Sequence, residues 1–586
     1  MSDFIYSNKI IEKGQLTKEF NRVFHFDHLD VYEFHGDWGS LAVTRNHYNG
    51  FLPYENDDHI AIVIGGPILY FRDNKFLNNN NSHEGTKSIY FRWREGKIVW
   101  DEDLSGPFAV LIINKKTCVV DLITDMMSFI PVFMYQDTKN TTLLSSHVDI
   151  LANLSGQNDK IDLISCADFI LHGAITFPYT TYKDIKQVYP ASIYRLSFKD
   201  HVLESHSYWL PKEEYKYKSI QEAANEIIKG LRRYIYAITS EVTNIAQFIS
   251  GGEDSRLLSA LLKEYPRDAI IFLDHMNREG IIAKKAANAY NANFKLATRS
   301  KTHYLRILPE CSDLVGSGSQ YHHAHTFGFH KSCKLDEYSA VFGGLLSDAL
   351  LKGSHIRRKL GKLSFLIEIK DEKNSIVNSA FSKLITEDAL NELKLRRQKH
   401  LNHIKSFRAS SAEEWFELWP SSMNKNIPNI HANRRLFKSY EPFMTNDLIK
   451  ISASVPQEWK LNRRLFHRAA KPFLKPTKWL SHSNGRLPYF PWYVNSVLQL
   501  SIKVIRKIGH TIGITKGHQG PWADWNAVVK SNEWDKAISE YSSGFKNISS
   551  IFSEEDVGKI LRDGNLDHFE KVNLMQLLYH IKKNST

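Results

Sequence analysis

Two short loops in the sequence combine glycine with serine and aspartate, residue types that can hold a phosphate group. The first loop, SGGEDS, starts at Ser250 and lies between an apolar stretch and a run with helical periodicity. Its glycines, Gly251 and Gly252, let backbone N–H groups point at an anion, and the dipole of a following helix adds positive charge. Ser250 and Ser255 add hydroxyl groups. The spacing therefore predicts a phosphate-binding loop.

Each loop also carries an aspartate that could bind a metal ion. Asp254 would repel a bound phosphate unless a divalent cation lay between them, and magnesium prefers one or two carboxylates together with substrate phosphates. The second loop, FGGLLSDALL, again follows an apolar strand and places Asp348 just after the pair Gly343 and Gly344. We therefore expect Asp254 and Asp348 to share one Mg²⁺. The alternative is that SGGEDS is a strand-to-helix turn whose serine and aspartate serve only as caps.

Alternating strands and helices position these loops. Residues 244–250 and 269–274 are predicted to be strands, residues 254–265 and 279–290 helices, and residues 338–344 a further strand. Such alternation is typical of βαβ units with a parallel sheet, in which ligands bind at the carboxyl ends of the strands. Both loops lie at such ends.

The first part of the chain is rich in predicted strands. Residues 59–71 and 106–114 are β-branched and aromatic, with turn residues between such stretches. A charged, proline-containing segment separates this part from a helix whose capping box begins at Ser219. We therefore expect two domains, residues 1–210 and residues 211–586.

Composition indicates an ordinary globular protein. The chain has 586 residues, of which 42% are hydrophobic, a formal net charge of +12, and four scattered cysteines without a CxxC pair. These features argue against a disulfide-rich secreted domain and a thiolate zinc site, and no apolar run is long enough to span a bilayer. We expect a cytoplasmic protein with no membrane partner. The basic clusters favour an anionic partner, but such clusters are more often solvated helix faces, so nucleic acid is not expected.

The motifs resemble those of a known family. SGGEDS is similar to the pyrophosphate-binding SGGxDS motif of the ATP-pyrophosphatase fold, and nearly the whole chain resembles the asparagine synthetase family, which includes β-lactam synthetases and lasso-peptide cyclases. Residues 106–135 and 176–192 resemble parts of the family's glutaminase-type domain, and residues 431–456 resemble its arginine-rich stretch. The resemblance implies an α+β glutaminase-like (Ntn-type) β-sandwich domain over residues 1–210. An α/β parallel-sheet ATP-pyrophosphatase domain with a helical C-terminal part would follow over residues 211–586.

The resemblance also implies an activity. Members of the family use ATP and Mg²⁺ to convert a carboxylate into an acyl-adenylate and pyrophosphate, and an amine then displaces AMP to form an amide. By position, Phe248, Leu273, Gly343 and Gly344 would line the adenine pocket. Arg464, where the family has a lysine, would stabilise phosphate or carbonyl oxygens. The implied partners are a carboxylate substrate and an amine nucleophile, with a precursor peptide as one candidate.

One departure from the family lies at the N-terminus. Glutamine-using members have a cysteine directly after the initiator methionine, whereas this chain has Ser2, and its first cysteine is Cys118. We therefore expect a glutaminase fold without glutaminase activity. A substrate-borne amine then becomes a better nucleophile than ammonia.

Another departure concerns the general base. Leu345 stands three positions before the second aspartate, where the family has a glutamate or a tyrosine, and Ala349 replaces an acid. Leucine cannot accept a proton. His322, His323 and His325 lie between the strand segments, and we expect His323 to be the base, because an unperturbed histidine titrates near neutral pH.

Three functions stay open at this point. The leading hypothesis is an ATP-dependent, AMP-forming amide ligase that acts on a substrate larger than aspartate. The second is an asparagine synthetase that uses ammonia or glutamine, against which Ser2 and Leu345 count. The third is a non-catalytic nucleotide-binding scaffold, which Leu345 and Ala349 favour.

Overall fold

The computed structural model describes most of the chain, as residues 3–26, 28–71, 82–197, 202–358, 379–498 and 522–585. Ser2 therefore lies outside the described residues. Among the helices within these ranges, none has the length and apolar character needed to cross a membrane.

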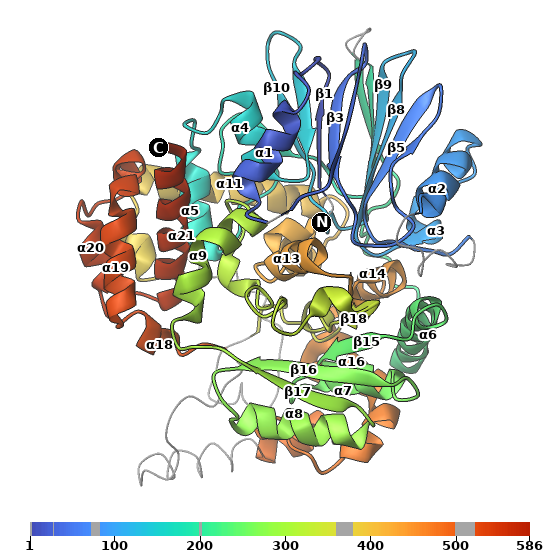
Figure 1. Ribbon diagram of the computed structural model, residues 1–586. Coiled ribbons are helices and arrows are strands. Elements are labelled where there is room, and N and C mark those ends of the chain that lie inside the picture. The colour runs from blue at the N-terminus through green and yellow to red at the C-terminus, as the bar shows by residue number, and fades with distance from the viewer. Residues whose placement is uncertain are drawn as a thin grey trace.

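Two antiparallel sheets form the N-terminal domain, at the top of Figure 1. The strands of the first sheet are, in order, β12 (Ile185–Gln187), β10 (Phe133–Gln136), β11 (Thr142–Ser145), β1 (Phe4–Ser7), β3 (Gly39–Thr44) and β2 (Val31–Gly36). Those of the second sheet are β14 (Val202–Ser207), β13 (Ser192–Ser197), β9 (Val119–Thr124), β8 (Phe108–Asn114), β5 (His59–Gly65) and β4 (Tyr54–Glu55). The strands expected within residues 59–71 and 106–114 are confirmed as β5 and β8.

Alternating apolar side chains join the two sheets into a sandwich. Tyr6 and Leu41 of the first sheet share a buried cluster with Ile60, Ile62 and Leu111 of the second. Residues two apart on a strand point to the same face, which is why one set of side chains from each strand enters this core.

A parallel sheet forms the centre of the second domain, in the lower part of Figure 1. Its strands are, in order, β17 (Asn293–Thr298), β16 (Arg267–Leu273), β15 (Ile245–Phe248), β18 (Ala340–Phe342) and β19 (Ser439–Tyr440). Helix α7 (Glu253–Leu261) follows β15, and α8 (Arg278–Ala289) follows β16, which confirms the predicted alternation. Because β15 and β18 are neighbours, the two glycine loops lie side by side at the carboxyl end of the sheet.

Helix α6 (Ile220–Thr239) joins the two domains. The Ser219 hydroxyl caps it by accepting a hydrogen bond from the backbone of Glu222, as the sequence predicts. Its buried residues Tyr234 and Ile235 belong to one apolar cluster with Trp100 and Phe108 of the N-terminal domain. The two domains therefore share a core at this helix.

The C-terminal part is helical, as expected, but it also packs against the N-terminal domain. Helix α21 (His568–Ser585) contacts α5 (Leu163–His172), and so does α11 (Glu387–Lys405). Figure 1 shows α21 beside α5, with α18 (Trp525–Val528), α19 (Asn532–Tyr541) and α20 (Val557–Arg562) nearby.

Candidate active site at the carboxyl end of the parallel sheet

The SGGEDS loop is shaped by its own hydrogen bonds. The Gly251 N–H donates to Glu279 Oε1 at 2.6 Å, and the Gly252 N–H donates to Ser250 Oγ at 3.1 Å. The Ser255 hydroxyl donates to the Ser250 carbonyl at 3.0 Å. The hydrogen bonds of Ser250 and Ser255 thus stabilise the conformation of the loop. Gly252 is the N-cap of α7 and no side chain caps this end, so the first turn of the helix presents N–H groups that suit an anion.

The two predicted metal ligands converge on a lysine. The ammonium of Lys352 contacts Asp254 Oδ1 and lies 3.0 Å from Asp348 Oδ1. Only 2% of the Lys352 side chain is exposed, and its Nζ lies 4.4 Å from the centroid of the Phe466 ring. Asp348 belongs to the short helix α10 (Ser347–Leu351), which Lys352 directly follows. Asp254 and Asp348 therefore point at a common position, which the ammonium of Lys352 occupies.

As arranged, these two carboxylates do not suit Mg²⁺. A divalent ion held by both Asp254 and Asp348 would lie directly against the buried ammonium of Lys352, and like charges at such separations repel strongly. Across the described ranges, no group of three or more His, Cys, Asp or Glu side chains could hold a metal ion. In this arrangement the two predicted magnesium ligands contact Lys352.

A second acid in the loop is paired with two arginines. Glu253 is 6% exposed, and its Oε1 lies 3.0 Å from Arg486 and 3.5 Å from Arg463. Burial alone would raise the pKa of Glu253, but Arg486 and Arg463 outweigh this effect and lower the pKa to about 2. Arg463 also lies 3.9 Å from Asp348, so it connects the two loops. Sequence reasoning missed Arg486 because nothing local in the chain marks it.

His482 offers a neutral donor beside the loop. Its Nδ1 accepts a hydrogen bond from the Asn484 N–H at 3.1 Å, so Nε2 carries the hydrogen in the neutral ring. A Cβ added at Gly252 would lie 4.0 Å from this Nε2, which places the ring beside the glycine turn. Burial, assisted by Arg486, lowers the pKa of His482 to about 3. The ring is therefore uncharged at neutral pH.

Arg256 ties the glycine loop to the segment that carries His482. Its guanidinium is fully buried and donates to the carbonyls of Gly251 at 3.0 Å, Leu480 at 2.7 Å and Ser481 at 2.9 Å. Its donors are thus directed at the backbone, and its role is to position the loop.

The residues predicted to line an adenine pocket differ in how deeply their side chains are buried. Phe248 is partly buried, with its ring 5.6 Å from that of Phe272. Leu273 is 0% exposed and belongs to an apolar cluster beneath α8, so its side chain lines no open surface. A Cβ on Gly344 would lie 3.5 Å from the Cβ of Asp254, which shows how closely the second loop approaches the first.

An acid that the sequence did not single out lies beside Leu345. The Glu441 carboxylate accepts a hydrogen bond from the Leu345 N–H at 2.9 Å, and a Cβ on Gly343 would lie 2.2 Å from Glu441 Oε1. Glu441 is 2% exposed, and burial raises its pKa to about 7. Glu441 therefore places an acid with a pKa of about 7 beside Leu345, the position where the sequence lacks the expected base.

Arg464, predicted to stabilise the transition state, lies apart from the acids. Its side chain is exposed and donates to the carbonyl of Glu458. The preceding residue, Arg463, makes the contacts with Glu253 and Asp348 instead. Arg463 and the residue before it, Asn462, have positive φ, so the backbone turns directly before Arg464.

The expectation that His323 titrates near neutral pH is wrong. His323 ends the 3-10 helix Tyr321–His323, and its ring centroid lies 4.6 Å from that of His322 and 5.6 Å from that of His325. Burial, together with Lys425, lowers the pKa of His323 to about 3. Such a weakly basic ring is a poor proton acceptor at neutral pH.

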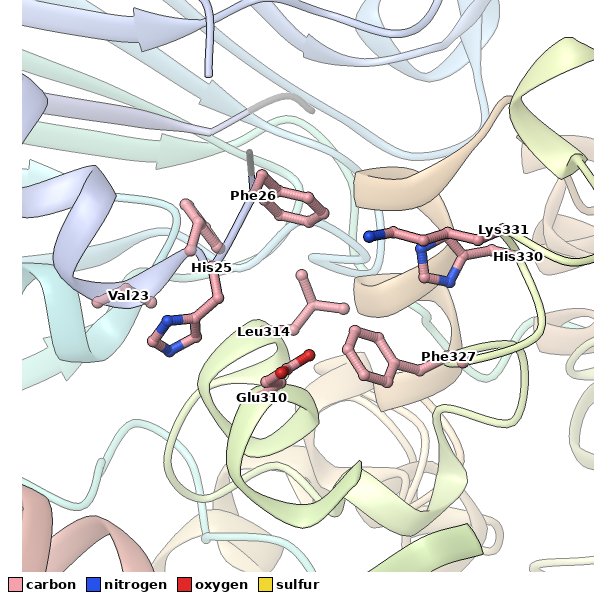
Figure 2. Close-up of a pocket in the computed structure, with 10 residues that line it drawn as sticks. Val23, His25, Phe26, Glu310, Leu314, Phe327, His330 and Lys331 are labelled. Atoms are coloured by element: carbon pink, nitrogen blue, oxygen red, sulfur yellow. The ribbon is translucent and has the colours of Figure 1, made fainter. Parts of the chain in front are cut away.

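A cavity of about 130 Å³ lies between the two domains (Figure 2). Figure 2 shows Phe26, Leu314 and Phe327 as apolar lining, with Glu310 and Lys331 among the polar residues around it. None of the predicted site residues lines it.

Comparisons with known proteins bear on the N-terminal domain. A family model described as a glutamine amidotransferase domain matches residues 48–209. None of the curated proteins compared with the chain matches it. Among solved structures, glutamine phosphoribosylpyrophosphate amidotransferase from B. subtilis, complexed with ADP and GMP, is 10% identical with a TM-score of 0.23, over 50% of this chain and 65% of that one. A structure of the allosteric regulatory enzyme of purine biosynthesis is 9% identical with a TM-score of 0.24, over 50% of this chain and 64% of that one.

The family-model match over residues 48–209 and the two antiparallel sheets indicate a glutamine amidotransferase-like N-terminal domain. This agrees with the glutaminase-like fold expected from the sequence. A parallel-sheet domain and a helical C-terminal part follow it.

Proposed function

We propose that the chain is an ATP-dependent, AMP-forming amide ligase, which adenylates a substrate carboxylate and joins it to an amine. The observation that carries this proposal is the convergence of two glycine loops at the carboxyl ends of neighbouring parallel strands. The uncapped start of α7 and the Nε2–H of His482 supply donors suited to phosphate oxygens there.

Positive side chains around the loops support a pyrophosphate leaving group. Lys352, Arg463 and Arg486 are held near the start of α7 by its acids and by Asp348. Cations that are already fixed stabilise negative charge as it develops, without reorganising during the reaction. In this proposal they face the departing pyrophosphate.

Glu441 is the base in this proposal. It takes a proton from the attacking amine, the task for which Leu345 has no suitable atom. Its burial, its position against the second loop and its pKa of about 7 support this role, because general bases work best with a pKa near the working pH.

The N-terminal domain does not supply ammonia in this proposal. We expect Ser2→Ala to leave amide synthesis unchanged, with ammonia release from glutamine absent in both proteins. A loss of glutamine-driven product in Ser2→Ala would instead favour the asparagine synthetase hypothesis.

ATP–pyrophosphate exchange tests the ligase. We expect exchange with some member of a broad carboxylate panel that includes peptides, and loss of most of it in Asp254→Asn. Asp268→Asn is the matched control, because Asp268 lies on β16 and pairs with Lys295. Circular dichroism checks that both variants fold.

A second function, a non-catalytic nucleotide-binding scaffold, has one observation in its favour. Lys352 forms ion pairs with both aspartates, the groups expected to bind the metal ion of a ligase. Tight ATP binding without exchange for any carboxylate in the panel would favour the scaffold.

A further inference from the structure

The cation between the two glycine loops is part of the chain itself. We propose that the ammonium of Lys352 is the resident cation of this site, and that Asp254 and Asp348 hold it in place of a divalent metal ion. The inference deepens the proposed function and rests on it where it assigns Lys352 to the phosphates of a nucleotide.

The contacts of Lys352 fit such a role. An ammonium has three N–H donors, and two carboxylates contact it here, Asp254 and Asp348. Its side chain is 2% exposed and lies over the Phe466 ring, so the charge is removed from bulk water. A buried charge of this kind needs compensation, and the two aspartates provide it.

The ion-pair cluster around Lys352 already matches in charge. Three acids belong to this cluster, Glu253, Asp254 and Asp348. Three cations contact them, Lys352, Arg463 and Arg486, so the cluster holds equal numbers of acids and cations. A divalent ion at the same position would disturb this balance and meet the ammonium directly. The cluster is therefore complete without a metal.

A lysine differs from a metal ion in what it can do for a phosphate. It remains attached to the chain at the end of α10, so it cannot leave with the product. It offers a point charge and a hydrogen-bond donor to a phosphate oxygen. Asp254 and Asp348 are then positioning residues for Lys352, and a nucleotide binds without a protein-held metal.

Metal binding by the full-length protein without nucleotide tests the inference. Mn²⁺ titration followed by electron paramagnetic resonance should reveal no stoichiometric site in the wild-type protein. Lys352→Met removes the ammonium and keeps most of the side-chain length, so it should bind Mn²⁺ at least tenfold more tightly. Lys352→Met combined with Asp254→Asn should lose this gain, and Lys352→Arg, which keeps the charge, should show none.

Thermal unfolding gives a second readout. Mg²⁺ should raise the Tm of Lys352→Met, because the ion compensates the two freed carboxylates, and it should leave the wild-type Tm unchanged. One Mn²⁺ bound per wild-type chain, lost in Asp254→Asn, would overturn the inference. That comparison is decisive even where Lys352→Met fails to fold.

Nucleotide binding separates this inference from the proposed function. Wild-type protein should bind ATP in EDTA within a few-fold of its affinity in Mg²⁺, and Lys352→Met should lose tenfold or more in EDTA. ATP binding that requires Mg²⁺, together with a wild-type Mn²⁺ site, contradicts the inference and leaves the ligase intact. Absence of ATP binding in both buffers contradicts the ligase, and the Mn²⁺ titration still decides which cation the aspartates hold.

Discussion

Two buried glutamates beside the glycine loops have opposite acidities. Glu253 contacts Arg463 and Arg486, and its pKa falls to about 2. For Glu441 burial dominates, opposed only by hydrogen bonds from the Leu345 backbone and the Ser439 hydroxyl, and its pKa rises to about 7. Glu253 is therefore a permanent charge at neutral pH, whereas Glu441 can exchange a proton.

Glu441→Gln should abolish proton transfer while preserving the shape of the site. We expect turnover to fall by about 10²-fold to 10⁴-fold, the usual contribution of a general base, with ATP affinity unchanged. Wild-type turnover should rise with pH through about 7, and this rise should be absent in the variant. Steady-state kinetics across pH check both points, and Ser439→Ala, which removes only a 3.4 Å hydrogen bond to Glu441, is the control.

Protein stability should also report the Glu441 carboxyl group. The pKa of this group is about 7 in the folded protein, whereas its ordinary value, expected in the unfolded chain, is 4.5. The folded state therefore holds the proton more tightly. The free energy of unfolding should therefore fall by at most roughly 3 kcal/mol as the pH rises from about 4.5 to 7. Above pH 7 it should stay constant. Urea unfolding at pH 5 and pH 8 measures this loss. A difference of the same size in Glu441→Gln would contradict the assignment.

At the scale of elements, one arginine connects the loop after β15 with the segment around residue 482. Arg256 donates to the carbonyls of Gly251, Leu480 and Ser481. The position of His482 beside the glycine turn thus depends on a side chain that lies within α7.

Arg256→Lys should loosen this connection. A lysine keeps the charge but cannot reproduce the planar set of donors, so we expect a loss of about 2–4 kcal/mol in unfolding free energy. ATP affinity should fall about tenfold, because His482 and Arg486 are no longer held at the loop. Urea unfolding and calorimetric titration check these effects, with Arg22→Lys, at a side chain 62% exposed, as the neutral control.

The local sequence pattern predicts the strands and helices of the parallel-sheet domain, but it predicts only part of the candidate site. The strand and helix alternation and both aspartates follow from residues close in sequence. Lys352 lies four residues after Asp348, so helical spacing could have suggested their pairing. Glu441 lies 96 residues from its partner Leu345, and no local signal selects that contact. Long-range ion pairs depend on the assembled fold.

At the scale of the whole molecule, a buried ion cluster joins the two domains. Asp3, beside β1, accepts hydrogen bonds from Arg434 and Arg435 of α13 (Pro428–Leu436), and all three side chains are at most 2% exposed. Burial alone would raise the pKa of Asp3, but the two arginines lower it well below its ordinary value of 3.8. The carboxylate is therefore charged throughout the neutral range.

Asp3→Asn should weaken the joint between the domains. Removing one partner of a buried ion cluster typically costs about 3–5 kcal/mol. Because the pKa of Asp3 is lowered on folding, this stabilisation is present above pH 4 and declines as the pH falls below the ordinary value of 3.8. Urea unfolding at neutral pH and at pH 3 tests both statements. Asp30→Asn, at a side chain 44% exposed, should change little.

The apolar cluster shared by α6 and the N-terminal domain bears on how such a chain could evolve. Deletion of residues 1–210 would remove the apolar side chains that pack against Tyr234 and Ile235 from the N-terminal domain. Because this exposes apolar surface, a polypeptide of residues 211–586 alone should aggregate on expression. An N-terminal domain that loses its own chemistry then cannot be discarded from the gene. Selection would retain it as a folding partner for the remainder of the chain.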